Sequence, residues 1–141
     1  MTDKPAASKP AANAASAISG YPFQRLLGFR KTMQTIDRAK LELELREDHL
    51  NIIGLPHGGL LASLLDAALG SAGCHMDPDN PRKAVTLNLN VSYIGQPDGT
   101  QLIAEGRRVG GGKTIYFSEG EVRDGSGKVL ARASGTFRYI G

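Results

Sequence analysis

The position of Asp66 makes it the strongest candidate for a reactive residue in this sequence. Asp66 is the one formally charged residue between His57 and Gly73, in a segment otherwise made of Gly, Ala, Ser and Leu. A buried carboxylate without a partner costs several kcal/mol, so it needs a hydrogen-bonding or ionic partner, a wet cavity or a chemical task. The sequence leaves both a structural contact and a reactive group open.

A second candidate feature is the run His57-Gly58-Gly59, which opens the same segment. Glycine costs about 1 kcal/mol relative to alanine in a helix interior. At a helix N-terminus it instead leaves backbone N–H groups accessible, and these groups together with the helix dipole stabilise a developing oxyanion. Close packing at the glycines is an equally good interpretation, and a single histidine can be structural or catalytic.

The segment that carries both features predicts a helix over 57–73. Pro56 precedes it and Gly73 ends it. On the helix surface, Asp66 shares a stripe of mostly small residues, and the leucines occupy the rest of the circumference. The stripe comprises Gly58, Gly59, Ala62, Ser63, Leu69, Gly70 and Gly73. Such a stripe lets another backbone or a slender ligand come close, and the low polarity predicts a central, nearly surrounded helix.

Strand-like alternation surrounds this helix in the sequence. Residues 41–45 read Leu-Glu-Leu-Glu-Leu, which predicts a half-buried strand with a hairpin partner near 30–38. A short helix carrying Leu26 and Leu27 precedes them, and further strands are expected near 85–93, 100–109, 113–123 and 129–139. A single antiparallel sheet needs its apolar face covered. The fold class is therefore α+β: one hotdog domain, with a curved antiparallel six-stranded sheet wrapped around one long central helix.

Length and composition bound the class of protein. The 141 residues are enough for one domain, expected over 18–141, and residues 1–17 are rich in Ala, Pro, Lys and Ser and predict a flexible tail. A net charge of +3 is far from the basic stripe of a nucleic-acid binder. The sequence has no apolar run of about 18 residues to span a membrane and no signal peptide in 1–17. We therefore expect a soluble, cytoplasmic protein that binds neither nucleic acid nor membrane.

Other sequence features favour no alternative chemistry. Cys74 is the only cysteine, so no disulfide forms within the chain, and no second metal ligand stands at zinc spacing. The serine nucleophile motif Gly-X-Ser-X-Gly does not occur. The run Gly110-Gly111-Gly112-Lys113-Thr114 lies between two expected strands and lacks the spacing of a phosphate-binding P-loop.

The pattern Asn51…Gly54…His57-Gly58-Gly59…Asp66 resembles the phenylacetate-pathway (PaaI-like) branch of the hotdog-fold acyl-CoA thioesterases. The six-residue step from Asn51 to His57 and the nine-residue step from His57 to Asp66 match that branch. The run from Ala84 to Tyr93 resembles the strand that follows the helix there, and the likeness extends over residues 45–140.

The resemblance implies hydrolysis of an acyl-CoA thioester to a free acid and CoA. Asp66 would activate the hydrolytic water as a general base, or attack the thioester directly. The Gly58 N–H would polarise the thioester carbonyl, and His57 would position the carbonyl end of the site. Asn51 would help to orient water or substrate, and Thr86 would hold the water. Because a thiolate leaves readily, one carboxylate and one polarising amide are a sufficient minimal set.

The resemblance also implies partners. In this family the site is shared across an obligate homodimer, with Asn51 and Gly58 of one subunit facing Asp66 and Thr86 of the other, and two dimers commonly pair into a homotetramer. CoA is part of the substrate, so no separate cofactor and no metal is expected. Its phosphates are assigned to residues at two places along the chain, namely Arg82, Lys83, Gly111 and Lys113. The acyl group stays open between aromatic, phenylacetyl-type groups and aliphatic chains.

One residue fits this assignment poorly, and two alternative functions remain. Thr86 has the opposite parity to Val85, Leu87 and Leu89, so on a regular strand it cannot share their face and reaches the site only through a strand twist or an intersubunit cleft. The first alternative function is a hotdog module that binds acyl-CoA without cleaving it. The second is a 3-hydroxyacyl thioester dehydratase that pairs a histidine with a carboxylate, which the motif match disfavours.

Overall fold

The computed structural model describes residues 20–141, so the predicted tail over 1–17 lies outside the described residues. The described chain forms two α-helices, a short 3-10 helix and six strands. In chain order they are α1 (Pro22–Leu27), β1 (Arg30–Gln34), β2 (Arg38–Glu44), η2 (Glu47–His49), α2 (Gly58–Ala72), β3 (Lys83–Tyr93), β4 (Gln101–Gly111), β5 (Ile115–Asp124) and β6 (Val129–Ile140).

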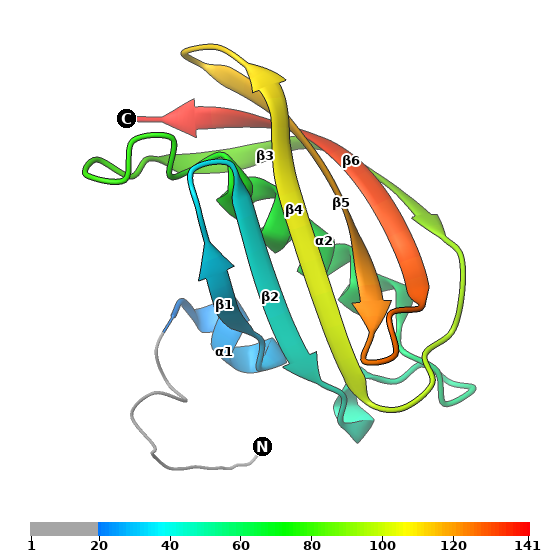
Figure 1. Ribbon diagram of the computed structural model, residues 1–141. Helices are drawn as coiled ribbons and strands as arrows, with labels where there is room; N and C mark the ends of the chain where they lie inside the picture. Colours follow the sequence, from blue (N-terminus) through cyan, green and yellow to red (C-terminus); the bar gives the residue numbers. More distant parts are fainter. Residues whose placement is uncertain (1–19) are drawn as a thin grey trace.

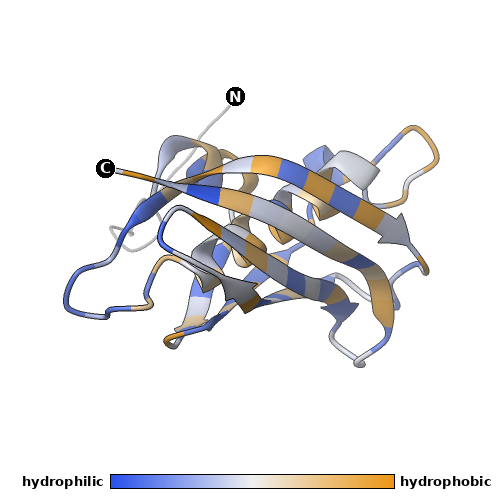
Figure 2. Cartoon of the chain, turned by 90° about the horizontal axis from the view of Figure 1, so that it is seen from above, coloured by the Kyte–Doolittle hydropathy of each residue, from blue (hydrophilic) through white to orange (hydrophobic). Residues whose placement is uncertain are grey.

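The six strands form one antiparallel sheet in the order β1-β2-β4-β5-β6-β3. The sheet curves, and α2 lies along its inner face (Figures 1 and 2). Contacts of α2 with β2, β4, β5, β6 and β3 place the core between helix and sheet. The predicted fold class is confirmed, including the hairpin before the helix and the short helix α1 that carries Leu26 and Leu27.

A row of glycine and alanine residues across the sheet sets the depth at which α2 lies. Ala39, Gly106, Gly120 and Ala133 are successive partners across β2, β4, β5 and β6. A Cβ atom on Gly106 would lie 2.4 Å from the carbonyl oxygen of Ala68 in α2. The helix backbone therefore rests directly on the sheet backbone at this point, with no side chain between them.

The face of α2 that contacts the sheet is fully apolar. Its buried residues are Leu60, Leu61, Leu64, Leu65, Ala68, Leu69 and Ala72. Ala62, Ser63, Asp66 and Gly70 on the other side are only partly buried. The sheet covers one side of α2, and the side that carries much of the small-residue stripe is only partly buried in a single copy of the chain.

Two tyrosines fasten the C-terminal end of α2 to the sheet. The hydroxyl of Tyr116 donates to the carbonyl oxygen of Gly70 at 2.6 Å, and that of Tyr139 donates to the carbonyl oxygen of Gly73 at 2.6 Å. Their rings lie 4.6 Å apart. These bonds engage carbonyl groups of the last turn of α2 and of its C-cap, so the end of α2 is fixed against β5 and β6.

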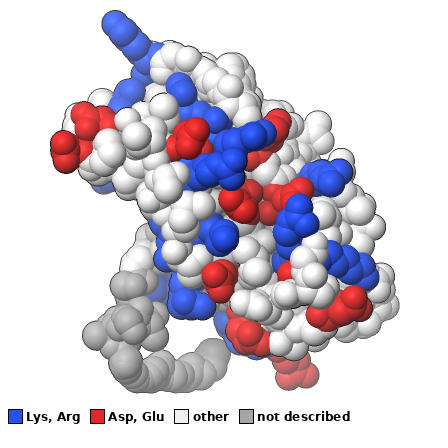
Figure 3. Space-filling model, in the orientation of Figure 1, with Lys and Arg blue, Asp and Glu red and all other residues white. Residues whose placement is uncertain are grey.

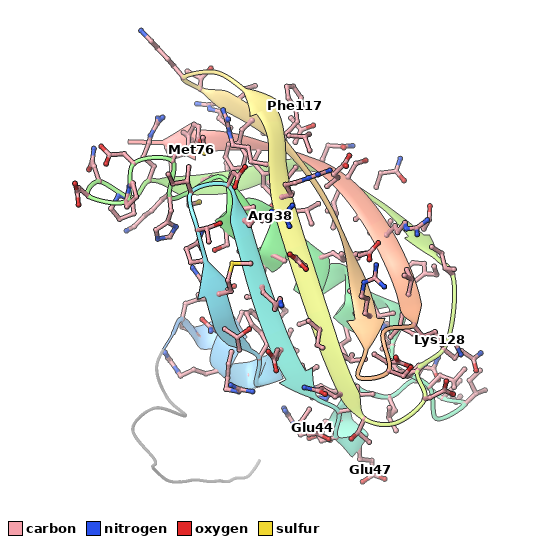
Figure 4. All side chains as sticks on the ribbon, viewed as in Figure 1. Arg38, Glu44, Glu47, Met76, Phe117 and Lys128 are labelled. Atoms are coloured by element: carbon pink, nitrogen blue, oxygen red, sulfur yellow. The ribbon has the colours of Figure 1, made fainter. Side chains whose placement is uncertain are left out.

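The outer face of the sheet carries charges of both signs. Acidic and basic side chains intermingle over this face (Figure 3). Arg38, the first residue of β2, is labelled in Figure 4. Cross-strand ion pairs are Arg38–Glu105 at 3.1 Å, Arg107–Glu119 at 2.6 Å and Arg132–Glu121 at 3.3 Å. Such exposed pairs contribute little to stability, and they leave this face a patchwork of mixed charge.

Candidate active site

The structure brings Asp66 and Thr86 together within one chain. The hydroxyl of Thr86, on β3, donates a hydrogen bond to Asp66 Oδ1 at 2.6 Å. No lysine, arginine or histidine of residues 20–141 forms an ion pair with Asp66. Among the described residues Asp66 therefore forms no salt bridge, and its side chain contacts a hydroxyl instead.

A β-bulge explains how Thr86 reaches the helix. The pairing of β3 with β6 shifts between Thr86 and Asn88, so Leu87 is an additional residue in β3. Before the bulge Thr86 faces α2 and Leu87 is 52% exposed, whereas after it Leu89 packs against the core. The expectation from regular alternation, with Leu87 and Leu89 on one face and Thr86 on the other, is therefore wrong, because a bulge exchanges the faces of a strand.

A cavity of about 550 Å³ adjoins Asp66 and Thr86. Its lining includes the buried apolar side chains of Phe29, Leu41 and Phe137. Basic and polar residues line the remainder, among them Lys31, Ser71, Cys74, His75, Arg82 and Lys83. Space beside the carboxylate gives a water molecule or a substrate access to Asp66.

Tyr21 is a cavity residue that sequence reasoning missed. It precedes α1 and lines the same cavity as Asp66. Burial, and secondly the negative charge of Asp66, raise the pKa of the Tyr21 phenol. The phenol therefore stays protonated near neutral pH and remains available as a hydrogen-bond donor. Nothing in the sequence near Tyr21 distinguishes it from an ordinary aromatic residue before a short helix.

At the other end of α2, His57 caps the helix. Its Nδ1 accepts a hydrogen bond from the backbone N–H of Gly59 at 2.8 Å, and its backbone is extended. In the neutral ring the proton then sits on Nε2, which faces away from this bond. Helix capping by a side-chain acceptor is a structural role, and the predicted role of His57 at the carbonyl stays a prediction.

Gly58 is the first residue of α2, so its N–H belongs to the first turn, where backbone N–H groups have no intrahelical acceptor. Its carbonyl oxygen accepts a hydrogen bond from the hydroxyl of Tyr93 at 2.6 Å. This bond ties the helix start to the last residue of β3. Tyr93 is a second residue that sequence reasoning missed, since alternation along the strand showed only its face.

Asn51 shapes the loop that leads into α2. Its Oδ1 accepts hydrogen bonds from the backbone N–H groups of Ile53 and Leu55, both at 3.0 Å. Its backbone N–H donates to the carbonyl oxygen of Leu55 at 2.7 Å. The side-chain oxygen is therefore engaged in the loop, and only the Nδ2 amino group is left to orient water or substrate. That role stays a prediction.

The two halves of the predicted site are separated within one chain. Gly58 and Asp66 are eight residues apart on the same helix, which corresponds to about 12 Å along its axis. Both groups cannot act on one thioester carbonyl from a single copy. His57 is likewise far from Asp66. Within one chain they therefore cannot form the histidine–carboxylate pair that the dehydratase alternative needs.

The residues predicted to contact CoA phosphates gather at one end of the sheet. Arg82 donates to the carbonyl oxygen of Lys113 at 3.0 Å, and its guanidinium lies 3.9 Å from the centre of the Tyr139 ring. Lys83 begins β3, beside Arg82. Gly111 has a φ of +143°, and a Cβ there would lie 2.5 Å from Tyr116 Cα. Backbone geometry thus requires Gly111, and its contact with a phosphate stays a prediction.

Residues 20–141 contain neither a metal-binding cluster nor a membrane-spanning helix. No group of three or more His, Cys, Asp or Glu residues in this range could hold a metal ion. No helix in it is long and apolar enough to cross a membrane.

The fold and site define a hotdog-fold protein with a carboxylate on its central helix beside an open cavity. The chain belongs to the Thioesterase superfamily, whose family model matches residues 54–131. This range contains Gly58, Asp66 and Thr86. The predicted class, a hotdog thioesterase, is therefore confirmed.

Relatives and solved structures agree with this family. Human acyl-coenzyme A thioesterase 13 is 28% identical over 123 residues, which cover 84% of this chain and 85% of that protein. A protein of Archaeoglobus fulgidus is 31% identical over 100 residues, which make up 70% of this chain but only 62% of that relative.

Among solved structures, the phenylacetic acid degradation protein PaaI of Thermus thermophilus has a TM-score of 0.75 at 27% identity, covering 85% of this chain and all of that one (100%). A Bacillus halodurans protein, solved with CoA, has a TM-score of 0.78 at 28% identity, covering 88% of this chain and 82% of that one. The resemblance to the PaaI-like branch is confirmed by these neighbours.

Proposed function

We propose that this protein hydrolyses an acyl-CoA thioester and that Asp66 is its catalytic carboxylate. The observation that carries the proposal is the Asp66 carboxylate, hydrogen-bonded to Thr86 at 2.6 Å and placed on the wall of a cavity without a cationic partner among the described residues. A relative named acyl-coenzyme A thioesterase and a structural neighbour solved with CoA support the choice of thioester.

The reaction needs a nucleophile and a stabilised oxyanion. Asp66 either takes a proton from water, which then attacks the carbonyl carbon, or attacks that carbon itself to form an anhydride that water later opens. In both cases a C–O bond forms, the C–S bond breaks and CoA leaves as a thiolate. The Thr86 hydroxyl holds the carboxylate in place, and the Gly58 N–H stabilises the negative charge on the carbonyl oxygen.

A second copy of the chain supplies the missing half of the site. The separation of about 12 Å between Gly58 and Asp66 along α2 supports this part of the proposal. β3 lies at the edge of the sheet with unpaired backbone groups, and its exposed apolar residues include Val85 at 45% and Leu87 at 52%. An exposed edge strand is a template for pairing with another chain. We therefore include a homodimer in the proposal, with Gly58 of one copy facing Asp66 of the other, and dimers pairing into a tetramer.

The first test is Asp66→Asn, which keeps the shape of the side chain and removes its charge. Turnover of acyl-CoA, followed by release of free thiol, should fall by a factor of about 10² to 10⁴, the range of acid–base catalysis, while Tm stays near that of the unchanged protein. Turnover close to the unchanged value would reject the role of Asp66. Thiol release also separates hydrolysis from the binding-only alternative, and enoyl product from a 3-hydroxyacyl thioester would indicate the dehydratase.

Complementation between copies tests the shared site. Gly58→Pro removes the N–H of the first helical residue and adds a ring whose Cβ would lie 3.4 Å from the Tyr93 hydroxyl, an ordinary contact distance. The first helical position suits proline, and so does the ψ of 137° at the preceding residue. Each single variant should lose about 10² or more in kcat. When the Gly58→Pro and Asp66→Asn proteins are mixed and allowed to exchange subunits, hybrid dimers should regain one intact site. Absence of any recovery, with exchange shown by mass spectrometry, would place the site within one chain.

A further inference from the structure

The far end of the cavity beside Asp66 presents basic groups that the proposed reaction does not use. The cavity runs along α2 and the turn that follows it, where Asp66, Gly70 and Cys74 recur at intervals of four residues. Asp66 and Thr86 stand at one end of this stripe. Lys31 of β1 and His75, just beyond α2, belong to the lining near the other end.

Lys31 has hydrogen-bonding capacity left at this place. Its Nζ donates to Gln34 Oε1 at 2.9 Å, and the hydroxyl of Ser71 donates to the same oxygen, also at 2.9 Å. An ammonium group carries three donors, and within residues 20–141 this bond uses one of them. The bond to Gln34 also holds the ammonium near Ser71, which lines the cavity.

His75 contributes a polar atom with no partner. Its Nδ1 is buried and forms no hydrogen bond among the described residues. Burial lowers the pKa of His75, and the positive charge of Lys31 lowers it further. Burial likewise lowers the pKa of Lys31. Among the described residues, the cavity lining contains one carboxylate, Asp66, and it lies at the opposite end. An anion between Lys31 and His75 would give His75 Nδ1 a partner and Lys31 a second one.

We propose that this cavity binds the acyl group of the substrate and that Lys31 and His75 bind a carboxylate at the far end of that acyl group. The inference rests on the proposed function. Ser71 lies near Lys31, because both donate to Gln34 Oε1. Ser71 is five residues from Asp66, or about 7.5 Å along the helix axis. This span suits an acyl chain of medium length. Arg82 and Lys83, which are assigned to the CoA phosphates, line the same cavity, so a test of this inference has to separate a carboxylate on the acyl group from the CoA part of the substrate.

The test compares two substrates that differ only in the terminal group. Adipoyl-CoA and hexanoyl-CoA have the same chain length, and adipoyl-CoA ends in a carboxylate. A hydrogen-bonded charge pair corresponds to a preference of about tenfold or more in kcat/KM for adipoyl-CoA. In Lys31→Met, and in Lys31→Gln, which keeps a hydrogen-bonding group, the ratio of the two kcat/KM values should fall to about one.

Lys128→Met is the matched control. Lys128 lies in the turn between β5 and β6, away from the Met76 loop that follows α2 (Figure 4), and its Nζ is 3.8 Å from an Asp98 oxygen. Its replacement should leave the substrate ratio unchanged. A lack of preference in the unchanged protein would overturn the inference. Equal losses for both substrates in Lys31→Met would also overturn it, since Lys31 would then serve the CoA part.

Binding to Asp66→Asn separates this inference from the proposed function. If the unchanged protein hydrolyses neither substrate, the proposed function fails. Calorimetric titration of Asp66→Asn with the two substrates still tests the carboxylate site, because binding needs no turnover. Tighter binding of adipoyl-CoA, lost in the double variant with Lys31→Met, supports the site, and equal affinities overturn it.

Discussion

Replacing Gly106 by alanine should disturb both stability and catalysis, because this glycine lets α2 rest on the sheet. The added Cβ would lie 2.4 Å from the carbonyl oxygen of Ala68, whereas ordinary contact begins at 3.4 Å. The colliding atoms belong to the helix backbone, so no side chain can rotate away. The helix must move by about 1 Å at Ala68, only two residues from Asp66.

The magnitude of both effects follows from this displacement. Overpacking of a core costs about 1–3 kcal/mol, which corresponds to a fall in Tm of about 3–15 °C for a domain of this size. A misplacement of about 1 Å in a catalytic group can cost about 10²-fold in rate. We therefore expect Gly106→Ala to lower both Tm, measured by calorimetry, and kcat, measured by thiol release.

Gly110→Ala provides the control on the same strand. A Cβ at Gly110 meets no atom within 4 Å. Alanine in place of glycine reduces the entropy of the unfolded chain, so this variant should be as stable as the unchanged protein or more stable by about 0.4–1 kcal/mol. Equal Tm and kcat values for the two alanine variants would refute the conclusion that Gly106 sets the depth of α2.

Three further predictions concern single hydrogen-bonded groups. Thr86→Val is nearly isosteric and removes the 2.6 Å bond to Asp66, so it should lower kcat about tenfold or more without a comparable fall in Tm. Thr86→Ser keeps the hydroxyl and should restore kcat, and an active valine variant would contradict this prediction. Tyr93→Phe removes the bond to the Gly58 carbonyl oxygen and should lower kcat several-fold with little change in KM; a change confined to KM would argue against positioning of the helix start. Asp124 accepts hydrogen bonds from Ser126, Lys128 and Asp98, which hold its pKa well below the usual range. Its contribution to stability is therefore complete above the usual carboxyl pKa of about 4 and is lost as pH falls below that value. The difference in Tm between the unchanged protein and Asp124→Asn should narrow from pH 6 to about pH 3, and a constant difference would exclude this linkage.

The fold could be predicted because its strongest signals are local. The apolar segment between Pro56 and Gly73, with Asp66 as its one formal charge, predicted α2, and the structure gives Gly58–Ala72. Period-two alternation predicted the strands, including β6, where Ala131, Ala133 and Phe137 are buried and Arg132 and Arg138 are exposed. These patterns depend on nearest neighbours along one element, so a single sequence contains them.

Contacts that depend on register or on tertiary packing could not be predicted. The bulge at Leu87 leaves hydropathy alternation intact along β3 while it exchanges the faces, so the pattern gave the wrong face for Thr86. Asn51 was assigned to the chemistry from the motif alone, and its two backbone bonds at 3.0 Å became visible only when the loop was folded. Lys31 and Tyr21 reach the cavity from elements far from α2 in sequence, and no spacing rule connects them with Asp66.

The bulge in β3 also couples the contact of Thr86 with Asp66 to the packing of Leu89 in the core. One inserted residue lets Thr86 turn inward before it and Leu89 turn inward after it, and it leaves Val85 and Leu87 on the outside of the edge strand. Deleting Leu87 would therefore reverse the faces of one half of β3 relative to the other. A chain without Leu87 would lose either the hydrogen bond from Thr86 to Asp66 or the packing of Leu89 against the core. We therefore expect natural variation in length to be excluded at this point, whereas the loops on either side of β3 are free to lengthen.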